Sequence, residues 1–220
     1  MNKLLIDNII YKDNIININN NVHNISVFGN FKVNIFNEDI DNLDVLINDN
    51  SSLEINYFNI IKKDQTRINI KTLNNAKFKF NYSFINEKTY NLLINTDFLE
   101  DSSIIDVNVF EINDGATSNI ILNGYVKNNK INNELNENIK ILNINGGKVT
   151  SMPNMFINNY LVKANHSNTI SNINKQELFY LMSKGLNKEN ATKLIRNGFI
   201  LKNLNDKELK IKVIEFLNRR

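Results

Sequence analysis

KFKFNYSFI, at Lys77–Ile85, alternates polar and apolar side chains over most of its length, and IIDVNVFEI at Ile104–Ile112 does the same. A period of two is typical of β-strands, whose successive side chains point to opposite faces of a sheet. We therefore expect short strands with one buried face and one wet face. Eight further segments share this period: NIININ (14–19), ISVFG (25–29), FKVNIF (31–36), LDVLI (43–47), LEINYF (53–58), RINIKTL (67–73), SNIIL (118–122) and IKILNI (139–144).

The spacing of these strands, near ten residues, suits a sandwich, a barrel or a β-helix. The chain has no cysteine and no tryptophan, so the Cys…Trp…Cys signature of immunoglobulin domains is absent. Tight hairpin signals are few: Asp114-Gly115, Asn123-Gly124 and Asn145-Gly146. This scarcity favours a coil that keeps winding in one direction, a parallel β-helix, although the pattern alone leaves the three folds open.

Composition excludes several classes of protein. About a fifth of the residues are asparagine, which we attribute mainly to an AT-rich genome; with seven glycines and one proline, asparagine must form many of the turns. A net charge of +3 is too small to predict nucleic-acid binding. Without cysteine there is neither a disulfide nor a thiolate ligand. The first residues do not resemble a secretory signal, and no apolar run has the length of a membrane span, so we expect a soluble, cytoplasmic protein without membrane contact.

From Asn174 onwards the period becomes helical. Asn174 and Glu177 form a pair like a capping box, and Gly185 follows at the C′ position. A second helix is expected to begin after Asn187 and to end at Gly198. A third is expected to begin after Asn205 or Asp206, with Leu209, Val213, Phe216 and Leu217 on its apolar side. Strands followed by a helical cluster predict an α+β arrangement.

The segment Ser151–Ile200 resembles the C-terminal core of the SufB/SufD family, scaffold proteins of iron–sulfur cluster assembly. The resemblance rests on Ser151, Pro153, Met155 and Ile157; on VKANHSNT at Val162–Thr169; on LFYLMSKG at Leu178–Gly185; and on the run from Glu189-Asn190-Ala191 to Gly198-Phe199. The first hundred residues fit the family only by strand character. The chain is shorter than typical members, which suggests that an N-terminal helical region and several coils are missing. It is nearer SufD, because it lacks cysteine and has Asn165 and Ser167, not acidic residues, beside His166.

The resemblance implies a mainly β fold: a right-handed parallel β-helix over residues 1–172 and a small C-terminal α-helical subdomain over residues 173–220. It implies a scaffold subunit that binds a SufC-like ABC ATPase and pairs with a SufB-like subunit or with itself through late coils, near 139–144 or 155–162. It implies no tightly bound cofactor, but a transient iron–sulfur cluster or iron shared at the subunit interface, with His166 as ligand. The expected ATPase-binding residues are Leu178, Phe179, Tyr180, Leu181, Lys184, Gly185 and Phe199.

Other interpretations stay open. His166 can be a structural histidine at the strand-to-helix junction, and the apolar helix residues can simply form core, packing on the last coil and capping the open edge of the β-helix. No Walker A, G-x-S-x-G or H-E-x-x-H motif is present, so we predict no enzyme activity. The alternatives are a carbohydrate-binding or lyase-like β-helix, with carboxylates at Glu38-Asp39-Asp41 and Glu100-Asp101, and an adaptor that only dimerises and binds the ATPase.

Overall fold

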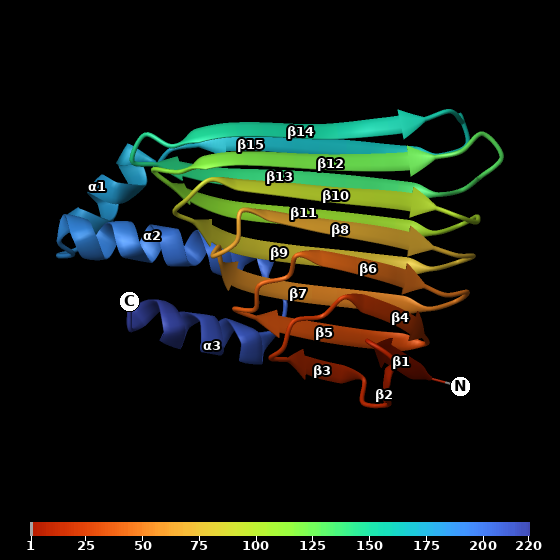
Figure 1. Cartoon of the computed structure of the whole chain (residues 1–220). Coiled ribbons are helices and arrows are strands. Elements are labelled where there is room, and N and C mark those ends of the chain that lie inside the picture. Colours follow the sequence, from red (N-terminus) through yellow and green to blue (C-terminus); the bar gives the residue numbers. More distant parts are fainter. Residues whose placement is uncertain (1) are drawn as a thin grey trace.

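In the computed structural model, which describes residues 2–220, the strands wind into a parallel β-solenoid with two strands in each coil (Figure 1). Sheet A has the order β14 (Lys148–Ile157), β12 (Thr117–Val126), β10 (Tyr90–Phe98), β8 (Gln65–Thr72), β6 (Asn42–Ile47), β4 (Asn24–Phe28), β1 (Lys3–Ile6), β2 (Ile9–Tyr11). Sheet B has the order β15 (Lys163–Ser171), β13 (Glu134–Ile144), β11 (Ile104–Asp114), β9 (Lys77–Asn86), β7 (Ser52–Ile60), β5 (Asn30–Phe36), β3 (Ile15–Ile18). Among the described strands, only β1 pairs antiparallel, with β2 and β4. The predicted parallel β-helix followed by C-terminal helices is confirmed.

The coils grow in length along the chain. Partner residues in sheet B are 22 positions apart between β5 and β7 and 30 apart between β11 and β13. This drift explains why the sequence shows no strict internal repeat. One turn prediction was wrong: Asn123-Gly124 lies inside β12. There Gly124 faces the interior, where an added Cβ would lie 2.1 Å from the Leu135 side chain, so glycine serves close packing and not a turn.

The interior of the solenoid is apolar and aromatic. Strand β9 directs Phe78, Phe80, Tyr82 and Phe84 inward, and all four are buried. The ring of Tyr82 stacks on that of Tyr57 at 4.4 Å, and its hydroxyl donates to the Asn59 side chain at 3.0 Å. Because the phenol oxygen has a partner, these aromatic rings can fill the core without leaving an unsatisfied polar group.

Asparagine has a structural role that composition alone did not reveal. On the outer faces, side-chain amides of successive coils bond to one another in ladders. In sheet B the ladder contains Asn17, Asn34, Asn56, Asn81, Asn108 and Asn138. In sheet A it contains Asn69, Asn95, Asn123 and Asn154. Asparagine also forms turns, as predicted, with positive φ at Asn8, Asn37, Asn50, Asn75, Asn132 and Asn145.

Three helices follow the solenoid: α1 (Lys175–Ser183), α2 (Lys188–Asn203) and α3 (Lys207–Asn218). The side chains of Asn174, Asn187 and Asp206 accept backbone N–H groups at the three N-termini, which confirms the predicted caps and selects Asp206 over Asn205. The predicted end of the second helix was wrong, because α2 continues past Gly198 to Asn203. Packing of the last turn against the solenoid outweighs the roughly 1 kcal/mol that glycine costs inside a helix.

Helices α2 and α3 lie along the outer face of sheet B, and α1 packs on α2 (Figure 1). Helix α2 contacts β9 and β11, and α3 contacts β5. The Asn203 amide donates to the Tyr82 carbonyl at 3.0 Å and to the Asn108 carbonyl at 3.2 Å. The shared apolar cluster comprises Phe58, Ile60, Ile85, Ile112, Leu142, Ile200, Leu204, Leu209, Val213 and Leu217.

This arrangement corrects two expectations. We expected each strand to have one buried face and one solvent-exposed face. The C-terminal halves of β7, β9 and β11 are instead buried on both faces. The helices cover the flank of earlier coils and do not cap the last coil, because the apolar outer surface that attracts them lies on β7 to β13. The domain boundary after residue 172 stays a prediction. Within residues 2–220, no helix is long and apolar enough to cross a bilayer.

Candidate functional site

His166 lies on β15, the last strand of sheet B, and its Cα partner on β13 is Glu137. The side chains of Asn165 and Ser167 bond outward-facing amides of the preceding coil, so His166, between them, faces the interior side. Because no coil follows β15 in the described chain, His166 is exposed at the open end of the solenoid. His166 is therefore the last in a row of inward-facing side chains, at a position that a ligand from outside the fold can reach.

Glu137 is a buried carboxylate directly beneath this end. It is 2% exposed, and neither carboxylate oxygen has a hydrogen-bond partner among residues 2–220. Burial raises the pKa of the Glu137 carboxyl to about 7. The sequence analysis missed Glu137 because it began this strand at Ile139. If the alternation is extended back to Leu135, Glu137 falls at a position where the pattern predicts an inward, apolar residue. A glutamate at such a position was the signal in the sequence that pointed to it.

The opposite wall of the interior leaves room for this carboxylate. A Cβ added to Gly124 would lie 3.3 Å from Glu137 Oε1 and 3.4 Å from Thr96 Oγ1. Gly124 is the register partner of Met155 on β14, so Met155 occupies the same layer in the last coil as His166. Carboxylate, imidazole and thioether groups are thus brought to the open end from three strands.

A metal ion would need donors beyond this chain. Residues 2–220 contain no group of three or more His, Asp or Glu side chains placed to hold an ion, and the sequence has no cysteine. Imidazole and carboxylate are suitable ligands for iron or zinc, but two donors leave coordination positions open. The carboxylates at Asp39, Asp41 and Glu100 instead form ion pairs with Lys62, Lys63 and Lys130.

Among residues 2–220, each sheet ends at the last coil in a strand that is paired on one side only. Strand β14 is the edge of sheet A and β15 the edge of sheet B (Figure 1). The prediction of a free strand near 139–144 was wrong, because β13 pairs with both β11 and β15. The free strands are instead 148–157 and 163–171, because the C-terminal helices pack on the flank and leave the last coil open.

Most of the sequence-predicted partner residues lie on α1, which contacts α2 and has no buried residue. Phe179 is 66% and Tyr180 60% exposed. The Lys184 ammonium lies 5.4 Å from the centre of the Tyr180 ring, and Gly185 follows with φ +96°. Leu178 and Leu181 are half-buried. Phe199 lies on α2 and packs against Phe110 of sheet B at 5.3 Å, so the structure does not bring it onto the exposed face of α1.

Comparison with known proteins finds similarity over part of the chain. Residues 128–199 match the family described as SUF system FeS cluster assembly, SufBD core domain. The iron–sulfur cluster assembly protein SufD of Plasmodium falciparum (isolate 3D7) is 32% identical over 97 residues, which are 42% of this chain and 7% of that protein. The matched segment therefore spans 7% of the relative's length. The chain is thus similar, over residues 128–199, to the core domain of SufB/SufD proteins, and the relative that it resembles over 97 residues is a SufD.

Proposed function

We propose that this chain is a non-catalytic scaffold subunit of a SUF-type iron–sulfur cluster assembly complex. The observation that carries the proposal is the position of the SufBD core match, residues 128–199. This segment contains the two free strands, the exposed His166 and the exposed helix α1. Three features that can receive partners thus coincide with the part of the chain that the family shares.

An iron–sulfur cluster would be the cargo of this scaffold. Such clusters are usually held by several cysteine thiolates, of which this chain has none. His166 and Glu137 can supply only part of a coordination shell, so the remaining ligands would come from a second subunit, either SufB-like or another copy. An interface at the open end would place those ligands opposite His166.

Strand β15 is a better candidate than β14 for pairing with a strand of a second subunit. The backbone N–H groups of Lys148 and Asn158 donate to carbonyls of the β12 segment, those of Ala116 and Val126. Because backbone N–H groups along a strand point alternately to its two sides, the odd-numbered residues of β14 point theirs toward the free edge. Pro153 is one of them and has no N–H, so it interrupts the row of donors there. Strand β15 contains no proline and offers an uninterrupted edge for a partner strand.

Helix α1 supports the second contact, with a SufC-like ABC ATPase. An exposed phenylalanine followed by an exposed tyrosine, on a helix without buried residues, is typical of a binding surface. Because α2 and α3 anchor the helical segment to sheet B, a force on α1 would be transmitted to the solenoid. ATP hydrolysis would be supplied by the partner, and cytoplasmic localisation stays part of the proposal.

Co-purification with the SufC-like ATPase of the same cell tests the proposal. The wild-type chain is expected to retain the ATPase, and the Phe179→Asp, Tyr180→Asp double variant is expected to lose it. The matched control is Ile211→Asp with Ile214→Asp, which adds the same charges to exposed positions of α3. Absence of ATPase from the wild-type preparation, or equal retention by both double variants, would contradict the proposal.

A further inference from the structure

Four pairs of residues in the chain have the composition that favours a reaction between side chain and backbone. In an Asn-Gly or Asp-Gly pair, the backbone nitrogen of the glycine can attack the Cγ atom of the preceding side chain and close a five-membered succinimide ring. Glycine favours this attack because it has no Cβ to obstruct it and because its backbone rotates freely. The four pairs are Asp114-Gly115, Asn123-Gly124, Asn145-Gly146 and Asn197-Gly198.

In three of these pairs a backbone hydrogen bond engages the glycine nitrogen. Gly124 lies in β12, which is paired with a strand on each side. Gly198 lies inside α2, where each backbone N–H donates to the carbonyl four residues earlier. The Gly115 N–H donates to the Ile144 carbonyl at 3.0 Å. In each case local structure must open before the nitrogen can attack.

The Asn145-Gly146 pair differs from the other three. It lies in an exposed turn between β13 and β14, with φ of +53° at Asn145 and +76° at Gly146. Among residues 2–220, the Gly146 N–H donates to no backbone carbonyl. Apart from its chain neighbours, no residue has an atom within 4 Å of the position of a Cβ added to Gly146. The peptide between the two residues can therefore rotate toward the Asn145 side chain without the loss of a Gly146 hydrogen bond or of packing.

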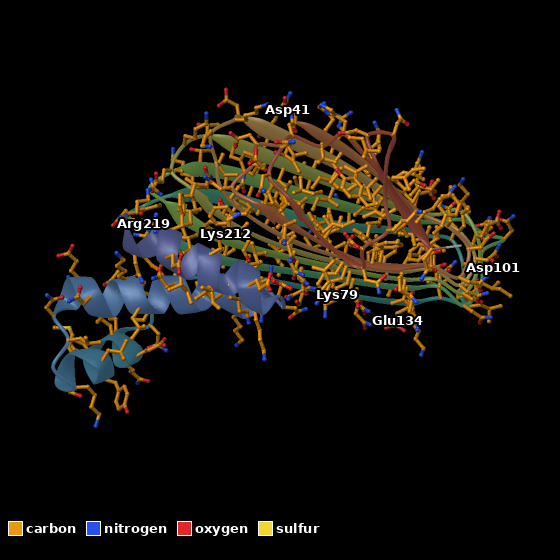
Figure 2. The ribbon with its side chains drawn as sticks, turned by 90° about the horizontal axis from the view of Figure 1, so that it is seen from below. Asp41, Lys79, Asp101, Glu134, Lys212 and Arg219 are labelled. Carbon is orange, nitrogen blue, oxygen red and sulfur yellow. The ribbon has the colours of Figure 1, made fainter. Side chains whose placement is uncertain are left out.

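The turn also lies where the solenoid meets the C-terminal helices. Figure 2 shows Arg219, which follows α3, and Asp101 at opposite ends of the molecule, and the turn after β13 lies at the Arg219 end (Figure 1). The Asn145 amide donates to one carboxylate oxygen of Asp114 at 2.5 Å. The other oxygen of Asp114 pairs with Arg196 of α2 at 3.0 Å. A change of charge at Asn145 would therefore act on a contact between the solenoid and α2.

We propose that Asn145 is a site of spontaneous deamidation. The Gly146 nitrogen gives its proton to solvent and forms a bond to Asn145 Cγ, and the side-chain nitrogen leaves as ammonia. Water then opens the succinimide at one of its two carbonyls, which gives aspartate or isoaspartate at this position. Water is the only co-reactant, and no atom is oxidised or reduced. The product carries one more negative charge and can no longer donate to Asp114, and the proposal does not depend on the partners proposed above.

Ageing of the full chain at mildly alkaline pH tests the proposal. Peptide mass spectrometry follows the conversion of each amide to an acid, and methylation by an isoaspartyl methyltransferase labels the isoaspartate. Asn145 is expected to convert first. Asn123 and Asn197 are expected to convert at least about tenfold more slowly, because a strand or a helix must open before the reaction.

Two variants separate the turn from the rest of the chain. Asn145→Gln lengthens the side chain by one methylene, so the five-membered ring cannot form, and the early conversion and the early methyl label are expected to disappear. Asn197→Gln is the matched control, because it changes an Asn-Gly pair inside α2, and it is expected to age like wild type. Circular dichroism confirms that both variants keep their secondary structure.

Ageing of wild type in urea shows whether the fold causes the difference. Without strands and helices, Asn123, Asn145 and Asn197 are expected to convert at similar rates. Any of three results would overturn the proposal: Asn145 that stays intact in the folded chain while the unfolded chain converts, Asn123 or Asn197 that converts as fast as Asn145 in the folded chain, or an early label that persists in Asn145→Gln.

Discussion

Two buried glutamates on adjacent coils differ in how the protein surrounds them. Glu111 and Glu137 both face the interior, and burial raises the pKa of each carboxyl to about 7. Glu111 is held by Ser118 and Asn86, whereas Glu137 has no partner among residues 2–220. The two thus have a similar electrostatic cost, but hydrogen bonds offset it only for Glu111.

The difference separates a structural role from a functional one. Asn86, Asn113 and the half-buried Asn143 form an amide ladder beside Glu111, so that carboxylate completes a polar network in the wall of three coils. Glu137 completes no such network and lies beside an exposed histidine. An unsatisfied buried acid in a native protein calls for an explanation, and use by a group from outside the fold is one.

Replacing Glu137 by methionine should have the largest effect. In the folded state the pKa is raised from 4.5 to about 7, so the folded protein binds more protons than the unfolded chain across this range. Stability therefore falls as the pH rises from about 4.5 to 7, by about 3 kcal/mol at 1.36 kcal/mol per pKa unit. Glu137→Met removes this loss, so its gain over wild type should be about 3 kcal/mol greater at pH 8 than at pH 4.

Urea unfolding of both proteins at the two pH values measures this difference. The surface variant Glu134→Met serves as a control for the change in net charge. A gain that does not vary with pH would contradict the burial of a titrating Glu137 carboxyl.

The same substitution at Glu111 should have a smaller effect of opposite sign at low pH. At pH 4 the carboxyl is neutral, and Glu111→Met leaves the Ser118 hydroxyl without its acceptor, at a cost of about 2 kcal/mol. At pH 8 relief from burying a charge, about 3 kcal/mol as for Glu137, should slightly outweigh that loss. Because the two pKa values are alike, both methionine variants should change by the same amount between pH 4 and pH 8 and differ by a constant offset from the lost Ser118 hydrogen bond. Parallel urea titrations measure that offset, and its absence would show that the two surroundings do not differ in energy.

Much of the fold was predictable, because the dominant signal is local. Alternation in segments such as Lys77–Ile85 identified most strands, and the caps at Asn174 and Asn187 identified two helix starts. Strand β10 was not predicted, although Tyr90, Leu92 and Ile94 alternate inward there. The site of helix packing was also missed, because it depends on outer-face residues from several coils that come together only after winding.

The candidate site was only half predictable. His166 was found through resemblance to a family motif, which is a property of consecutive residues. Glu137 lies 29 positions earlier and meets His166 only through the register of β13 with β15. Coil length varies from one coil to the next, so no fixed spacing in the sequence could pair them. The asparagine ladders escaped notice for the same reason, and composition alone suggested a genomic origin for that residue.

Replacing His166 by valine should have the smallest effect on stability. The histidine is exposed at an edge, and valine continues the apolar row of Phe80 and Val107 in a residue well suited to strands. We expect a change within about 0.5 kcal/mol in the free energy of unfolding, as for most exposed substitutions. Thermal and urea unfolding measure it, with Ala164→Val of the same strand as control. A loss well above 1 kcal/mol would mean that His166 is a structural histidine, although it lies within β15 and not at the strand-to-helix junction. The contrast between the satisfied and unsatisfied glutamates would then no longer point to a ligand.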